Sequence, residues 1–235
     1  MQRPPHRPNS GPNASPVNPM PPFVVALFLL IAGVEIAFSA GARGLVGGPG
    51  AVGWRLEAVQ AYAFSGDVFG WMLANGQYPK EHLIRFVTYL FVHGSFTQAA
   101  FAGVMLLALG KWVGEVFGAL PTLAVFFGSG IFGALAFGVL TNDPVLIGAF
   151  PAVYGLIGAF TYLLWVKLAA TGEHQGRAFS LIGMLMAIQL VFSVIFPNGS
   201  KDWVADLAGF AAGFAISLLV SPGSWHRIRG KLRRN

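Results

Sequence analysis

The sequence contains no cysteine, and charged residues make up only 10% of its 235 positions. Without cysteine the chain can form no disulfide, no thiolate metal site and no cysteine nucleophile. A soluble domain usually carries about 25% charged residues, so the shortage indicates that most of the surface faces something other than water. Hydrophobic residues reach 55% and glycines number 31, which is typical of helices packed closely inside a bilayer.

Signals for metals and nucleotides are also missing. None of the five histidines forms a close pair on one predicted helix, and no cysteine can join them as a metal ligand. No glycine-rich phosphate-binding or dinucleotide motif is present. We therefore expect neither a metal nor any other cofactor.

Six apolar segments are candidates for crossing a membrane. A crossing helix needs about 20 mostly apolar residues, because it rises about 1.5 Å per residue through about 30 Å of hydrocarbon. Only a helix satisfies the backbone N–H and C=O groups of such a segment without water. The segments are residues 23–40, 86–109, 120–140, 145–166, 178–196 and 203–220. The predicted fold class is an all-α membrane protein with six transmembrane helices.

The other stretches set the domain organisation. Residues 1–22, rich in Pro, Asn, Ser and Gly, are predicted to be a disordered cytoplasmic arm. A cleavable signal peptide is disfavoured, because its apolar region would be only about 7–15 residues long. The transmembrane domain is expected over residues 23–220, and residues 221–235 form a basic tail. The long first loop, residues 41–85, is typical of a helix lying in the membrane interface; a loop folded over the helix ends fits as well.

The net charge of +6 raises the question of a nucleic-acid partner, and its distribution argues against one. Five basic residues fall in the last nine positions, where a short tail after an apolar segment would meet anionic lipid headgroups. With six crossings both termini lie on one side, and ten of the fifteen Lys and Arg residues lie on that side. This bias predicts cytoplasmic termini for a multi-pass protein of a bacterial inner membrane.

Three stretches, at residues 85–95, 148–159 and 202–213, carry a resemblance to a known family. They resemble, in order, the sequence leading into H-x-x-x-x-H-x-x-x-N, the G-x-S-G-x-x-x-G helix and the A-H-x-x-G-x-x-x-G helix of the rhomboid intramembrane serine proteases. The resemblance covers roughly residues 22–220. It implies a rhomboid-like bundle of six helices with a long first loop.

In that family a serine and a histidine on facing helices carry the chemistry, because the histidine takes the proton of an otherwise weak nucleophile. The resemblance places Phe150 at the serine position and Asp206 at the histidine position. A phenylalanine ring has no nucleophilic atom, and a carboxylate at position 206 has no serine to activate. Pro151 replaces the following glycine and has no backbone N–H to offer an oxyanion.

The oxyanion region departs from the family pattern too. By resemblance, His93 matches the first histidine, Gln98 stands at the second, and Ala102 stands at the asparagine. Gln98 can still donate a hydrogen bond, whereas Ala102 cannot. Because the loss of one oxyanion donor alone costs about 10²–10³ in rate, we expect no catalytic residues and no single substitution that restores them.

This sequence retains other residues of the family pattern. Arg85, Glu115 and Tyr154 resemble family residues that support the scaffold. Four glycines on the second and third stretches are expected to let helices pack closely; they are Gly155, Gly158, Gly209 and Gly213. The scaffold is therefore predicted to be better preserved than the chemistry.

Two acidic residues within apolar segments need partners, because a carboxylate in a membrane helix is costly. Asp206 is assigned to a candidate polar cluster, whose members are His93, Gln98, Tyr154 and Asp206. Glu35 is a weak candidate for a proton or ion relay, since no second acidic residue recurs along a plausible path. Its role stays open at this point.

The sequence thus predicts a non-proteolytic pseudoprotease that binds transmembrane helices of client proteins or acts in membrane-protein quality control. Its expected partners are the lipid bilayer and such helices. The alternative is an active rhomboid serine endopeptidase, through a shifted alignment or another serine. A small transporter or channel is a third class, disfavoured because no inverted repeat of broken helices is evident. The client and the oligomeric state do not follow from the sequence.

Overall fold

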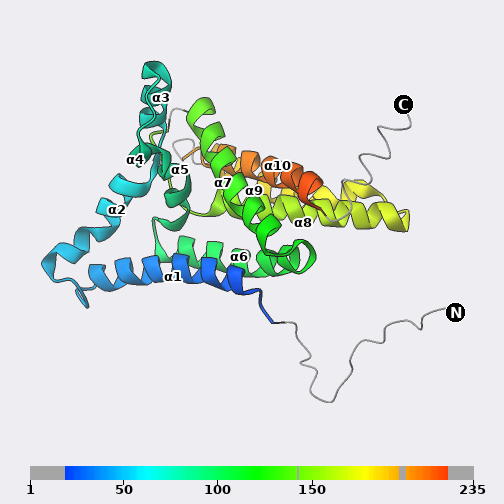
Figure 1. Ribbon diagram of the computed structural model, residues 1–235, viewed down its shortest axis with the longest axis horizontal. Helices are drawn as coiled ribbons and strands as arrows, with labels where there is room; N and C mark the ends of the chain where they lie inside the picture. The colour runs from blue at the N-terminus through cyan, green and yellow to red at the C-terminus, as the bar shows by residue number, and fades with distance from the viewer. Residues whose placement is uncertain (1–18, 142, 196–199, 222–235) are drawn as a thin grey trace, which may run out of the picture.

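The computed structural model describes residues 19–141, 143–195 and 200–221. Most of the expected N-terminal arm and of the basic tail lies outside the described residues. The elements, in chain order, are α1 (Pro22–Ala42), η1 (Pro49–Gly53), α2 (Trp54–Tyr62), β1 (Phe64–Ser65), α3 (Gly66–Asn75), α4 (Lys80–Leu83), α5 (Arg85–Thr88), η2 (Tyr89–Phe91), α6 (Phe96–Phe117), α7 (Ala119–Leu140), β2 (Val145–Leu146), α8 (Phe150–Thr171), η3 (Gln175–Phe179), α9 (Ser180–Ile195) and α10 (Trp203–Val220) (Figure 1).

Within the described residues, five helices are long and apolar enough to cross a membrane: α1, α6, α7, α8 and α10. The prediction of an all-α membrane protein is confirmed. The sixth expected segment corresponds to α9, which has 16 described residues. At about 1.5 Å per residue this helix spans about 24 Å, less than the roughly 30 Å of bilayer hydrocarbon. The sixth crossing, and with it the placement of both termini on one side, stays a prediction.

The second membrane helix begins later than expected, so the predicted span 86–109 is wrong. Residues 85–91 form the short helices α5 and η2, and the chain is extended at Val92 before α6 begins. Ser95 caps α6, because its Oγ accepts the N–H of Gln98 at 3.2 Å. The helix ends at Gly118, whose φ of +80° favours glycine. Residues 110–117, expected in a turn, therefore belong to α6.

The fourth segment was also expected too early, at 145–166. Residues 145 and 146 form β2, which pairs antiparallel with β1 from the long first loop. Phe64 of β1 is buried in a cluster of rings, with Phe86 at 4.9 Å and Phe137 at 6.4 Å between centroids. The strand pair thus fixes the first loop to the stretch just before α8, and the loop holds three separate helices, α2, α3 and α4, rather than one.

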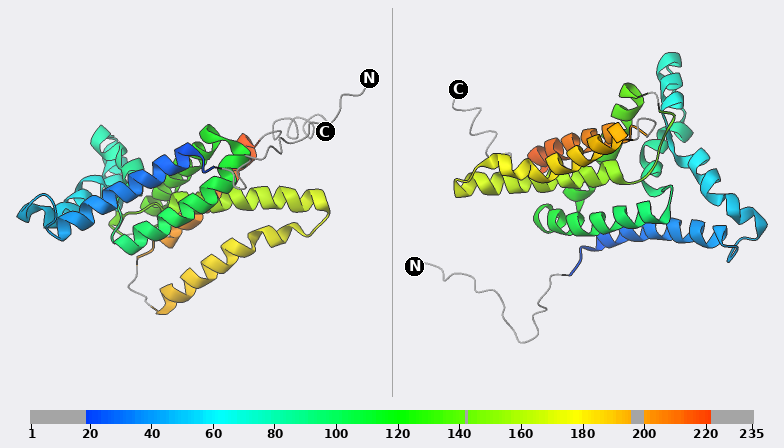
Figure 2. Two further views of the ribbon diagram at one scale, coloured as in Figure 1. Left: turned by 90° about the horizontal axis from the view of Figure 1, so that it is seen from below. Right: turned by 180° about the vertical axis from the view of Figure 1, so that it is seen from behind.

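The centre of the molecule is formed by α7, α8 and α10, and α1 packs along α6 beside them (Figure 1). Glycines set the distances between the central helices. A Cβ at Gly209 or Gly213 would overlap the backbone of α8, and one at Gly158 would overlap the backbone of α10. A Cβ at Gly155 would overlap the side chain of Ser129 on α7. By contrast, α9 diverges from α8 after the η3 turn (Figure 2).

Candidate functional site

The candidate site lies where the first turns of α8 and α10 meet. Gly209 lies against Pro151, and Gly213 lies against Gly155. From the first contact to the second, the position advances by four residues in α8 and by four in α10. The two helices therefore run parallel in a fixed register. Small residues on both faces let the backbones touch, which is why this register is specific.

This register brings the two positions of the absent dyad to neighbouring turns. Asp206 lies about one helical turn before Gly209 on the same face of α10, and its charge is near the Tyr89 hydroxyl. Phe150 is the first residue of α8. Asp206 is only 4% exposed. Sequence reasoning therefore predicted which helix ends come together at this crossing.

Tyr89 is a member of this region that sequence reasoning missed. It is fully buried, and its hydroxyl donates to the carbonyl oxygen of Gly130 on α7 at 2.8 Å. Burial, followed by the nearby charge of Asp206, raises the pKa of the Tyr89 hydroxyl well above its usual value. Its backbone oxygen accepts the N–H of Gly148 at 2.9 Å. Tyr89 thus connects η2 both to α7 and to the turn before α8.

The ring of Phe150 lies in apolar surroundings. Its centroid is 6.2 Å from that of Phe101 on α6, and Phe101 is 58% exposed. The ring also packs against the apolar cluster that contains Tyr154, Ile157 and Ile182. The serine-equivalent position therefore presents a hydrocarbon surface between α6, α8 and the base of α9.

The oxyanion-equivalent residues meet at the turn before α8, where they stabilise the backbone. His93 accepts the N–H of Ala149 through Nε2 at 3.2 Å, and burial lowers the pKa of His93 to about 4, so the imidazole is neutral as this acceptor role requires. Gln98 accepts the N–H of Gly94 through Oε1 at 2.7 Å. Gly148, with φ +96°, lies against the Gln98 amide and the His93 ring.

Ala102, the third position of this region, is a fully buried methyl group on α6. It has no polar atom to contribute. Of the predicted polar cluster, His93 and Gln98 thus come together around Gly148, while Tyr154 and Asp206 lie on the α8 and α10 side of the crossing. Whether all four act as one cluster stays a prediction.

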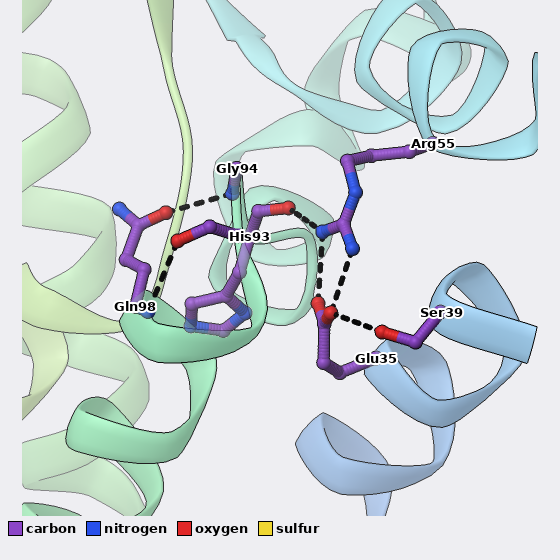
Figure 3. A network of polar contacts seen from close by, with 7 residues as sticks. Glu35, Ser39, Arg55, His93, Gly94 and Gln98 are labelled. Atoms are coloured by element: carbon purple, nitrogen blue, oxygen red, sulfur yellow. Dashed lines mark hydrogen bonds and ion pairs between the residues drawn. The ribbon is translucent and has the colours of Figure 1, made fainter. Parts of the chain in front are cut away.

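Arg55, which sequence reasoning did not single out, connects the first loop to this site (Figure 3). It donates to both carboxylate oxygens of Glu35, at 2.8 and 2.6 Å, and to the backbone oxygen of His93 at 2.6 Å. Ser39 donates to the same carboxylate at 2.9 Å. The structure thus gives Glu35 a structural role: the guanidinium of Arg55 on α2 balances the negative charge of the Glu35 carboxylate on α1. An acid in an apolar segment signals such a cation partner, although not which one.

In the described part of the chain, the membrane serines have other neighbours than histidine. Ser217 donates to its own helix at the carbonyl oxygen of Gly213, 2.7 Å away. Ser129 is buried against Gly155. His174 accepts the N–H of Gly176 in an exposed turn. Among the residues described, no serine hydroxyl is hydrogen-bonded to an imidazole.

Comparison with known proteins gives consistent matches. A family model described as the Rhomboid domain matches residues 80–223. The chain is 27% identical over 150 residues to the "Putative rhomboid protease YdcA" of Bacillus subtilis (strain 168), covering 63% of this chain and 69% of that protein. It is 29% identical over 142 residues to "Rhomboid-like protease 3" of Toxoplasma gondii, covering 59% of this chain and 52% of that protein.

A third similar protein is "Rhomboid-related protein 3" of Mus musculus, 26% identical over 173 residues, with 66% of this chain and 43% of that protein covered. The chain therefore spans about half the length of the second and third of these relatives, and about two thirds of the first. The matched region includes every site residue from His93 to Asp206.

Proposed function

The chain belongs to the Rhomboid family, and on that premise we propose that it is a non-proteolytic member that binds transmembrane segments of other proteins. It is an integral membrane protein, since five of its helices are long and apolar enough to span a bilayer. The contact between α8 and α10 supports the proposal, because the resemblance assigns Phe150 and Asp206 at this contact to the positions of a serine and a histidine.

The groups at this contact are unsuited to peptide hydrolysis. An acyl transfer needs a nucleophile, a base within hydrogen-bond reach and donors for the oxyanion. Phe150 offers no nucleophilic atom, and Pro151 offers no backbone N–H. Ala102 provides no donor, and Gln98, whose Oε1 accepts the N–H of Gly94, keeps only its side-chain amide N–H groups as donors. The nucleophile and two oxyanion donors are missing together, so the site is not one substitution away from activity.

The surroundings of Phe150 support binding of an apolar helix. The ring and its neighbour Phe101 form an aromatic surface between α8 and α6, and α9 diverges from α8 after the η3 turn (Figure 2). Transmembrane helices associate mainly through van der Waals packing and small polar contacts, and an aromatic surface beside a diverging helix supplies such packing. We further propose that this binding serves membrane-protein quality control.

The proposal is tested by photo-crosslinking in proteoliposomes. A benzophenone amino acid at position 101, beside the proposed surface, is expected to capture a single-pass membrane protein added to the same vesicles. The matched control places the same amino acid at Leu120, which is exposed on α7 and outside that surface. Equal capture at both positions, or none at position 101 with any of a panel of single-pass proteins, would contradict the proposal.

The alternative function is that of an active intramembrane serine endopeptidase. It is favoured by the names of two relatives, which are described as proteases. A fluorophosphonate probe separates the two functions, because it reacts with activated serines alone. Labelling that is lost on Ser129→Ala, the variant of the buried serine beside α8, would favour the protease, and absence of labelling on the intact protein favours the binding function.

A further inference from the structure

A hollow of about 340 Å³ lies between α1, α2 and the α5–η2 stretch, away from the α8–α10 crossing. Its exposed lining is entirely apolar. The residues that shape it include Val34, Ala37, Phe38, Ala58, Tyr62 and Phe91. The hydroxyl of Thr88 is already donated to the backbone oxygen of Tyr62 at 2.9 Å, and no polar side-chain surface is exposed in the hollow. Ordered water needs polar partners, and this hollow provides none.

The position of the hollow along α1 indicates whether water or lipid surrounds it. Its α1 residues lie between eight and four residues before Ala42, the end of the helix, which is about 12 to 6 Å along the axis. A bilayer has about 30 Å of hydrocarbon, so this depth falls within the acyl chains of one leaflet. Ile36, on the same stretch of α1, is exposed, as expected for a residue that contacts lipid.

The size of the hollow selects the kind of molecule that fits. An α-helix with side chains is about 10 Å across, which is wide for a hollow of about 340 Å³ lined by eight residues. A single hydrocarbon chain is far thinner. We propose that the hollow binds one acyl chain of a bilayer phospholipid, held between α1 and the first loop.

The charges nearby suit the headgroup of such a lipid. The guanidinium of Arg55 lies over the ring of Phe38, 5.2 Å from its centroid, and the Arg55 side chain is partly exposed. Arg43 is exposed directly after α1. Arg43 lies on the loop side of the hollow, where the phosphate of a lipid with its chain in the hollow would lie, whereas the guanidinium of Arg55 is already paired with Glu35. Bound in this way, the lipid fills the space between α1 and α2 and stabilises their contact.

The test uses the full-length protein in vesicles of phosphatidylethanolamine and phosphatidylglycerol. The vesicles contain a phosphatidylcholine with a photoactivatable diazirine midway along one acyl chain. After illumination, peptide mapping is expected to show label concentrated on residues 34–38 and 58–62. Ala58→Trp fills the hollow and is expected to reduce this label several-fold. The matched control is Ala61→Trp, an exposed position on the same helix outside the lining, which should leave the label unchanged.

If Ala58→Trp prevents folding, Ala37→Leu fills the hollow from α1 with a smaller side chain and carries the same expectation. Label spread evenly along the exposed side of α1 and insensitive to both filling variants would overturn the proposal. So would crosslinks from the hollow to a protein segment rather than to the lipid. Neither result bears on whether the site at Phe150 cleaves peptides, so the two proposals fail separately.

Discussion

The helices α8 and α9 follow one another in the chain and differ in how they are held. In α8, residues 151–159 are all buried, and glycines bring its backbone against α10. In α9, Ile182 is buried, whereas Leu181, Met184 and Ile188 are exposed and Gly183 has no atom near the position of a Cβ. The helix α8 is thus fixed by close packing against α10, while the next helix, α9, is loosely held.

This difference bears on the proposal of a rhomboid scaffold without protease chemistry. The contacts that position α8 are close backbone contacts at glycines and the hydrogen bond from the Ala149 N–H to His93, whose backbone oxygen in turn accepts from Arg55. None of them depends on a serine at position 150 or a histidine at position 206. The packing of the fold is therefore independent of the residue types at positions 150 and 206, as the proposed function requires.

The largest expected effect on stability comes from disrupting the close packing of α8 against α10. Gly213→Ala places a methyl group onto the backbone of Gly155. We expect a loss of about 4 kcal/mol of unfolding free energy, above the usual 1–3 for overpacking because backbone atoms cannot rotate away. The control Gly183→Ala on α9 should change stability by less than about 0.5 kcal/mol. Unfolding titrations in mixed micelles measure both, and equal effects would contradict the comparison.

The next effect concerns the polar contacts that hold the first loop to the turn before α8. Arg55→Ala leaves the carboxylate of Glu35 without its cation, and we expect a loss of about 3 kcal/mol, the lower end for breaking a buried pair because the guanidinium is partly exposed. Arg177→Ala, which breaks the exposed pair with Glu173 beside α9, should cost under about 0.5 kcal/mol. A similar loss from both variants in the same titration would show that burial of the pair does not matter.

A smaller effect follows from pH. The pKa of His93 is lowered from 6.5 to about 4 in the folded protein, so between these values the unfolded chain binds a proton that the folded one does not. The contribution of His93 to the free energy of unfolding is complete above about pH 6.5 and is lost as pH falls toward 4. The loss is about 2 kcal/mol at pH 5. The stability of His93→Gln should depend less on pH over this window. An unchanged slope in that variant would exclude His93 as the source.

The smallest expected effect is at the serine-equivalent position itself. Phe150→Ser introduces a hydroxyl without an imidazole partner, because Asp206 stands opposite and Pro151 follows. We expect no gain of fluorophosphonate labelling. Labelling of this variant, absent from the parent protein, would show that the base and oxyanion donors still function.

The predicted bounds of some elements agree closely with the structure, and those of others are shifted for physical reasons. The span 203–220 coincides with α10, and 120–140 differs from α7 by one residue. Hydrophobicity alone placed residues 86–92 and 145–149 in membrane helices, because short helices and a buried strand are as apolar as a span. The pattern Ser95-x-x-Gln98 was a visible helix-start signal that marked the true beginning of α6.

The site could be predicted only as far as local signals reach. Motif spacing placed Phe150 and Asp206 on helices that pack together. The partners Glu35 and Arg55 are separated by 20 residues, and His93 and Ala149 by 56. Such pairs depend on the tertiary arrangement, which no local pattern in one sequence encodes.

The central claim is that this member of the family holds a transmembrane segment without cutting it. The direct measurement is the intact mass of a single-pass membrane protein after prolonged incubation with the purified chain in proteoliposomes, beside an active rhomboid protease as positive control. The account predicts one undiminished mass with this chain and two fragments with the control. Two fragments produced by this chain, and lost on Phe150→Ala, would contradict it.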